Sequence, residues 1–136
     1  MVRFGIQSQQ EGMCDIVETF KKIVIENLDG GITMITINDK RLVDEKDVEE
    51  LGEELFSVAR MRGKNKILLN WKNVEFCSSF FLGKLFKLNR IIQAGRGKLV
   101  FCLVPGEIWE VFKATSLNVI FDVRKTQLDG ILAFEG

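Results

Sequence analysis

Two adjacent serines, Ser78 and Ser79, are the residues best placed for chemistry in this chain. They lie between a short apolar strand predicted over residues 66–71 and a long helical pattern that runs from Ser79 to Ala94. The N-terminus of a helix offers unpaired N–H donors and the positive end of the helix dipole. A serine in this position commonly caps the helix, an interaction that contributes about 1 kcal/mol. Position alone therefore favours capping over a functional serine.

Phosphorylation is the alternative chemistry at this joint. A phosphate adds about −1.5 to −2 charges, which a helix N-terminus tolerates. The modified domain need not refold, because the phosphate can repel an acidic partner surface or clash with one that packs closely. The serine pair is therefore a candidate binding switch.

Nucleophilic catalysis by either serine is disfavoured, because the chain contains no histidine to act as a base. Tyrosine is also absent. The three cysteines, Cys14, Cys77 and Cys102, form an odd set without a CxxC pair. This count argues against a metal knot or a disulfide framework, and it fits a reducing cytoplasm. We also expect no cofactor.

A small enzyme or carrier that uses Cys77 is a further hypothesis, because a helix N-terminus can lower the pKa of a thiol. The neighbouring Phe76, Phe80 and Phe81 make the surroundings apolar, and no base is evident in the sequence. We therefore expect no catalytic residues and a protein that is not an enzyme.

Length and composition indicate one globular domain. The chain has 136 residues, of which 46% are hydrophobic and 28% charged. Its net charge is zero, so no bulk attraction to nucleic acid or to an anionic membrane is expected. The longest apolar run, residues 99–104, is too short for a membrane span, and the N-terminus lacks the apolar core of a signal peptide.

The hydrophobic pattern predicts the element order β-β-α-β-α-β-α-β-α. Asp29-Gly30-Gly31 separates two β-branched runs and predicts a hairpin. Asp44 opens a helix that Gly63 is expected to end, and Arg41-Leu42-Val43 is read as a connector. The remaining predictions are buried strands at 67–69 and 99–104, a loop at 70–75, a helix after Pro105, a strand at 119–121 and a helix at 126–134.

Residues 1–20 are predicted to be an N-terminal extension, in which 15–22 form either a helical turn or the lead into the first strand. The first helix should pack through Val48, Leu51, Leu55 and Val58. Ile108, Val111 and Phe112 are the packing candidates on the third helix, and Leu128, Ile131 and Leu132 on the last.

The helix over residues 79–94 has one apolar face and a second face that mixes apolar and basic residues. At 100° per residue, one face groups Phe81, Leu85, Leu88 and Ile92, and we expect it to cover the sheet. The other groups Phe80, Lys84, Lys87 and Ile91 beside the serines. This second set, called here the Phe80–Ile91 strip, is read either as a solvated face or as an exposed docking site.

The motif Val-Glu-Phe-Cys-Ser-Ser-Phe-Phe-Leu-Gly-Lys-Leu at 74–85 resembles the switch motif of STAS domains, the anti-sigma factor antagonists. Residues 41–44, 50–55, 95–102, 105–112, 115–117 and 120–121 resemble further parts of that family, so the likeness covers about 21–134. It implies an α/β fold, a single STAS domain over 21–136 with a mixed sheet of four or five strands and helices packed against it.

The same resemblance implies a function in transcription regulation by partner switching. The partner would be an anti-sigma factor that is also a serine kinase, phosphorylating Ser79 rather than Ser78, and a metal-dependent serine phosphatase would reverse the mark. The implied partner-binding residues are Cys77, Ser78, Phe80, Gly83, Lys84, Lys87 and Ile91.

This sequence departs from the usual Asp-Ser-Ser-Gly-Leu-Gly motif at two positions. Cys77 stands in place of the aspartate, and Phe80 in place of the first glycine. The alternative function is therefore a STAS adaptor or scaffold that binds through the Phe80–Ile91 strip and is never phosphorylated.

Overall fold

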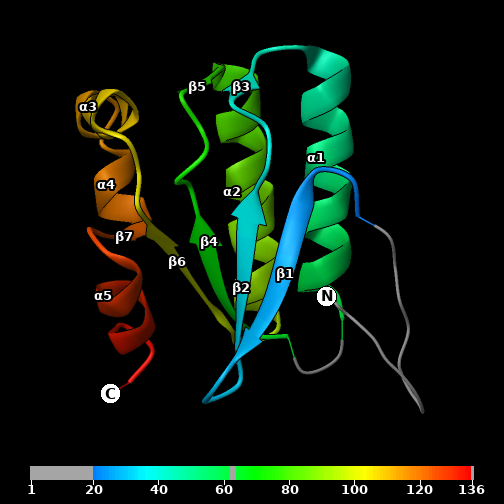
Figure 1. Cartoon of the computed structure of the whole chain (residues 1–136), viewed down its shortest axis with the longest axis vertical. Coiled ribbons are helices and arrows are strands. Elements are labelled where there is room, and N and C mark those ends of the chain that lie inside the picture. Colours follow the sequence, from blue (N-terminus) through cyan, green and yellow to red (C-terminus); the bar gives the residue numbers. More distant parts are fainter. Residues whose placement is uncertain (1–19, 62–63, 136) are drawn as a thin grey trace.

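The computed structural model describes residues 20–61 and 64–135. The predicted N-terminal extension lies almost wholly outside these residues, as does Gly63, the expected end of the first helix. Within the described residues the elements are β1 (Ile23–Leu28), β2 (Ile32–Ile37), β3 (Arg41–Leu42), α1 (Glu45–Ala59), β4 (Lys66–Asn70), β5 (Phe76–Cys77), α2 (Ser79–Ala94), β6 (Lys98–Cys102), α3 (Gly106–Ala114), α4 (Leu117–Ile120), β7 (Asp122–Arg124) and α5 (Gln127–Leu132) (Figure 1). No helix in this part of the chain combines the length and apolar character needed to cross a bilayer.

The main sheet has five strands in the order β1-β2-β4-β6-β7. β1 is antiparallel to β2, and the other neighbours are parallel, so the predicted mixed sheet is confirmed. Gly30 and Gly31 turn the hairpin between β1 and β2 with φ angles of 84° and 78°, which side-chain-bearing residues rarely adopt.

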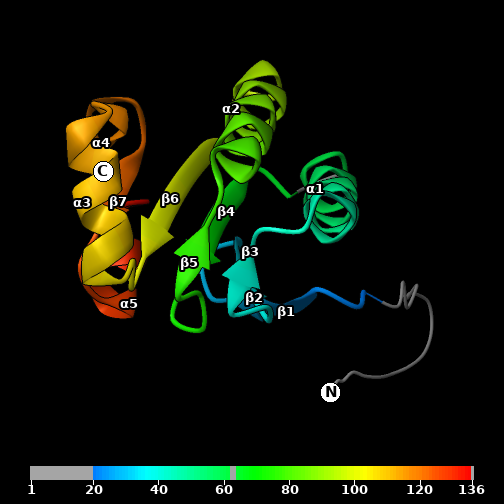
Figure 2. The ribbon, with the colours of Figure 1, turned by 90° about the horizontal axis from the view of Figure 1, so that it is seen from above.

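Helices cover both faces of this sheet, but unequally (Figure 2). α1 and α2 lie on one face, over a large core to which the strands contribute Ile35, Leu69 and Phe101. α5 lies on the other face, over a smaller cluster that includes Met34 and Leu68. The predicted packing residues of α1 and the sheet-facing set of α2 are all buried, which confirms both expectations.

Trp71, directly after β4, is the centre of an aromatic cluster in the larger core. Its side chain is fully buried. Its ring lies 5.7 Å from that of Phe81 on α2, 5.3 Å from Phe101 on β6 and 5.6 Å from Phe112 on α3. One residue thus joins the helix that begins at Ser79 to the strand and helix beside it.

Two predictions about local structure are wrong. Residues 119–121 were expected to be a strand, but the chain forms α4 there, and the amide of Phe121 donates to the carbonyl of Leu117 at 2.9 Å. The strand follows at β7. The connector at 41–43 contains β3, which pairs with β5, a second short strand that directly follows the loop predicted at 70–75. A two-residue strand is too short to leave a periodic pattern in the sequence.

Three predicted packing residues are exposed instead. On α5, Gly130 faces the sheet, and an added Cβ would lie 2.7 Å from Leu68. Leu128 and Leu132, each two positions away, therefore point outward and are exposed, whereas Ile131 is half-buried. On α3, Ile108 and Phe112 are buried as predicted, but Val111 is exposed.

The turn between α2 and β6 depends on the absence of a side chain at Gly97, where a Cβ would lie 2.3 Å from the carbonyl oxygen of Asn65. We predict that Gly97→Ala lowers the free energy of unfolding by about 1–3 kcal/mol, because the backbone must move. Gly95→Ala is the matched control, since its Cβ would meet no atom closer than 3.6 Å. Urea denaturation measures both, and equal losses would contradict the prediction.

Candidate functional site

The backbone that leads into Ser79 is fixed by the small sheet of β3 and β5. The amide of Ser78 donates to the carbonyl of Leu42 at 2.9 Å, and the amide of Glu75 donates to the carbonyl of Lys40 at 2.7 Å. The start of α2 is therefore held in place by backbone hydrogen bonds to the segment before α1. These hydrogen bonds hold the backbone before Ser79 in one conformation, so that Ser79 has a fixed position at the start of α2.

The two serines differ in accessibility. Ser78 is the N-cap residue of α2, with extended backbone angles, but its side chain makes no capping hydrogen bond. Its Oγ is buried and has no hydrogen-bond partner within the described residues. Ser79 is the first residue of the helix and is exposed. The capping expected of the pair is thus absent at Ser78, and Ser79 is the serine open to solvent.

Cys77 precedes the serines and is half-buried. Burial raises the pKa of its thiol to about 11, so the reactive thiolate is scarce at neutral pH. In the part of the chain that the structure describes, no three Cys, Asp or Glu side chains converge to hold a metal ion. This environment gives no support to chemistry at Cys77.

Lys84 belongs to the interface between α1 and α2. Its amine pairs with the carboxylate of Glu49, and its alkyl chain lies over Gly52, where an added Cβ would be 3.1 Å from Cδ of Lys84. The amine also lies 5.1 Å from the ring centre of Phe80. The structure therefore brings Phe80 and Lys84 together, and Lys84 is engaged with α1 instead of projecting freely.

The rest of the Phe80–Ile91 strip also borders α1. The amine of Lys87 lies 4.8 Å from the ring centre of Phe56 on α1, and Ile91 is half-buried against the main core. Only Phe80 and Lys87 in the strip are exposed. The expectation of one continuous exposed strip is therefore wrong, because Lys84 pairs with Glu49 of α1 and Ile91 packs against the main core, which leaves both side chains half-buried.

Gly83 lies one turn after Ser79 on the outer face of α2. It is exposed, and an added Cβ would meet no atom of the chain within 4 Å. A glycine inside a helix lowers stability by roughly 0.5–1 kcal/mol relative to alanine. No contact within the described residues requires a glycine here, and its small size leaves the helix surface open to close approach.

Phe76 is a site residue that the sequence reasoning missed. Its side chain is 47% exposed, and the guanidinium of Arg41 lies 5.3 Å from its ring centre. Phe80 is 39% exposed, so two phenyl rings, each next to a cation, flank the serines. Val43, also exposed, follows β3. The position of Phe76 depends on its pairing with Arg41 across β3 and β5. This is a tertiary contact, so the local sequence pattern does not predict it.

No protein-family model matches the sequence, and no curated protein matches it. Several solved structures are similar to this one. A Thermotoga maritima protein assigned as an anti-sigma factor antagonist superposes with a TM-score of 0.75 at 17% identity, covering 84% of this chain and 95% of that one. An anti-sigma factor antagonist (STAS) domain protein from Planctomyces limnophilus gives 0.74 at 21% identity, with coverages of 84% and 98%.

The unphosphorylated form of the Bacillus anti-sigma factor antagonist SpoIIAA gives a TM-score of 0.62 at 14% identity, with coverages of 82% and 94%. SpoIIAA has also been solved in its phosphorylated form. These likenesses show that the chain has the STAS-domain fold of the anti-sigma factor antagonists. The fold expected from the motif at 74–85 is therefore confirmed.

The buried, unpaired hydroxyl of Ser78 leads to a stability prediction. Ser78→Ala should leave the free energy of unfolding unchanged or raise it, because it removes a buried polar group that has no partner. Thr126→Ala is the matched control: Oγ1 of Thr126 caps α5 by accepting from the amide of Asp129 at 3.0 Å. The control should lose about 1 kcal/mol. Chemical denaturation compares them, and a similar loss at Ser78 would restore the capping interpretation.

Proposed function

We propose that this protein is a cytoplasmic anti-sigma factor antagonist that switches partners through phosphorylation of Ser79. Its partner would be an anti-sigma factor that is also a serine kinase, and a serine phosphatase would reverse the mark. The observation that carries the proposal is the contrast between the serines, since Ser79 is exposed on a fixed backbone and the Ser78 hydroxyl is buried. A kinase can reach the Ser79 hydroxyl without local unfolding, but not the Ser78 hydroxyl.

The position of Ser79 suits a modification that changes binding and not folding. The first turn of α2 contains no acidic residue, so a phosphate there would face the positive end of the dipole without a repelling carboxylate in that turn. The same phosphate would place its charge next to the exposed ring of Phe80. A partner that buries this ring would then have to desolvate a phosphate, which strongly disfavours the complex.

The exposed rings beside Ser79 support a protein-binding role. Phe76 and Phe80 offer large apolar contacts at the end of the sheet where α2 begins. Aromatic side chains supply much of the energy at protein interfaces, especially when they are held in place before binding. Arg41 and Lys84 hold these two rings through cation–π contacts, and Lys84 is itself fixed by Glu49.

The fold adds a context for this proposal. Anti-sigma factor antagonists share it, and one of them, SpoIIAA, exists in a phosphorylated form. Carrying that modification to Ser79 of this chain is our inference. The raised pKa of the Cys77 thiol further favours a binding protein over an enzyme that uses this cysteine.

Phosphorylation is tested by intact-mass measurement after incubation with ATP and each purified kinase–anti-sigma factor of the host. The wild-type protein and Ser78→Ala should each gain one phosphate, and Ser79→Ala should gain none. Peptide mapping locates the mark. A phosphate on another residue would refute the switch, whereas a stable complex without any phosphate would favour the adaptor alternative.

Complex formation is tested by substitution of the two rings. Phe80→Ala and Phe76→Ala should each weaken binding of the kinase–anti-sigma factor about 30-fold, the effect of losing roughly 2 kcal/mol at an aromatic anchor. Leu132→Ala is the control, because Leu132 is also 47% exposed but lies on α5, across the sheet from α2. Titration calorimetry measures the three affinities, and equal effects would exclude the rings as anchors.

The same titration separates the switch from the adaptor. A switch requires Ser79→Asp to weaken the complex, and an adaptor requires that variant to bind like the wild type. Lys84→Glu is a poor probe of either function, because it would place a second carboxylate against Glu49 and disturb the α1–α2 interface. Phe80→Ala avoids this difficulty.

A further inference from the structure

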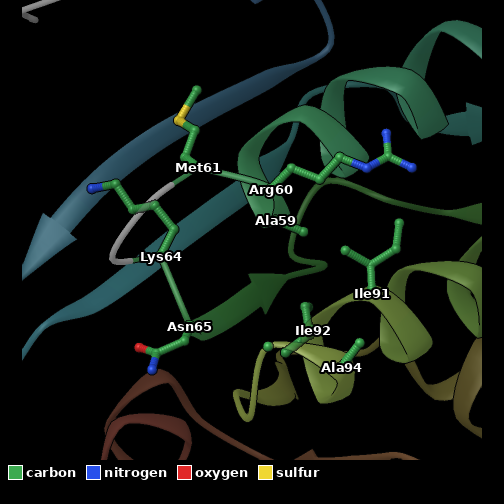
Figure 3. Close-up of a pocket in the computed structure, with 9 residues that line it drawn as sticks. Ala59, Arg60, Met61, Lys64, Asn65, Ile91, Ile92 and Ala94 are labelled. Carbon is green, nitrogen blue, oxygen red and sulfur yellow. The ribbon is translucent and has the colours of Figure 1, made fainter.

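A groove lies between the C-terminal ends of α1 and α2, at the far end of α2 from Ser79. It encloses about 440 Å³. Figure 3 shows Ala59 of α1 across from Ile91, Ile92 and Ala94 of α2, whereas Lys64 points away from the space they share. The side chains that face each other from the two helices are thus apolar, and Arg60, Lys64 and Asn65 add polar atoms to the lining. Apolar hollows bind water poorly, so an apolar occupant would gain by filling this one.

The rim of the groove is positively charged. Arg60 lines it, and Lys87 lies outside the lining, one helical turn before Ile91 on α2. The guanidinium of Arg60 and the amine of Lys87 lie 5.8 and 4.8 Å from the ring centre of Phe56. Neither cation forms an ion pair with an acidic side chain of the described residues. An occupant that matches this site therefore combines apolar side chains with carboxylates.

The segment that precedes β1 has this composition. Residues 11–19, Glu-Gly-Met-Cys-Asp-Ile-Val-Glu-Thr, contain three carboxylates and no lysine or arginine. Its apolar side chains, Met13, Ile16 and Val17, are spaced at three and four, as on one face of a helix. Residues 1–19 are also the longest stretch of this chain outside the described structure.

The chain enters the fold close to the groove. The carboxylate of Glu54 on α1 accepts hydrogen bonds from the amides of Lys21 and Lys22 at 3.0 and 2.9 Å. Ala59 lies five residues further along the same helix, a rise of about 7.5 Å. The three residues between Val17 and Lys21 span about 10 Å when extended, at about 3.3 Å each, so the apolar face of Met13, Ile16 and Val17 can reach the groove from this anchor. The tether also gives the segment a high effective concentration there.

We propose that residues 11–19 of the same chain dock in the α1–α2 groove. Ile16 and Val17 cover the floor formed by Ile91 and Ile92, and Asp15 meets the cationic rim at Arg60. The contact is intramolecular and lies at the opposite end of α2 from Ser79. It is therefore independent of the proposed phosphorylation, and either can fail without the other.

Disulfide trapping with the native Cys14 tests this contact in the full chain. Ala94→Cys places a thiol at the groove, and Ser57→Cys is the control: residue 57 is exposed on α1, nearer the anchor at Glu54, and does not line the groove. In a glutathione redox buffer, Cys14 should pair with position 94 within one chain at least about tenfold faster than with position 57. Non-reducing electrophoresis and peptide mass mapping identify the products.

Equal trapping rates at the two positions would overturn the proposal, since an undocked segment reacts at least as readily with the nearer thiol. Trapping only between two chains would also overturn it and assign the groove to a second copy. Charge reversal gives a second measurement with the same readout. Arg60→Glu and Asp15→Lys should each reduce the preference for position 94, and the two together should restore it. Rates that do not respond to either substitution would contradict the role of these charges.

Discussion

The buried indole of Trp71 is the constraint on which the edge of the domain that carries Ser79 depends. It contacts rings from α2, β6 and α3 within a single cluster. Phe81, its partner on α2, lies two residues after Ser79, so the packing of one tryptophan sets where the first turn of that helix can be. The position of an exposed serine is thereby determined from inside the core.

The small sheet of β3 and β5 completes this arrangement from the outside. Trp71 fixes α2 through side-chain packing, and the hydrogen bond from Ser78 to Leu42 fixes the residue before it through the backbone. The two departures from the STAS motif lie on either side of the serines, Cys77 in β5 and Phe80 in the first turn of α2. Cys77 is half-buried, and Phe80 extends outward next to Lys84. A bulky residue in place of glycine is accommodated because its ring points away from the core.

The sequence was sufficient for the features that rest on periodicity or on local chemistry. The bounds of α2, its buried face and the N-cap at Asp44 could all be predicted, because each follows from residues close together in the chain. The partial burial of the Phe80–Ile91 strip could not be predicted. Whether Lys84 is free or engaged depends on Glu49 and Gly52, more than thirty residues earlier. Likewise, Gly130 faces the sheet because it has no side chain, and this orientation of α5 leaves Leu128 and Leu132 exposed.

The exposure of Val43, Phe76 and Phe80 has a consequence for how such domains diversify. These side chains project from a frame that is held by other residues, chiefly Trp71 and the β3–β5 backbone. Surface substitutions of this kind usually change stability by less than about 0.5 kcal/mol. Under the proposed function, recognition and folding are therefore encoded by separate residues. A domain with this frame could then change its partner through these three positions while its core and its stability stay nearly the same.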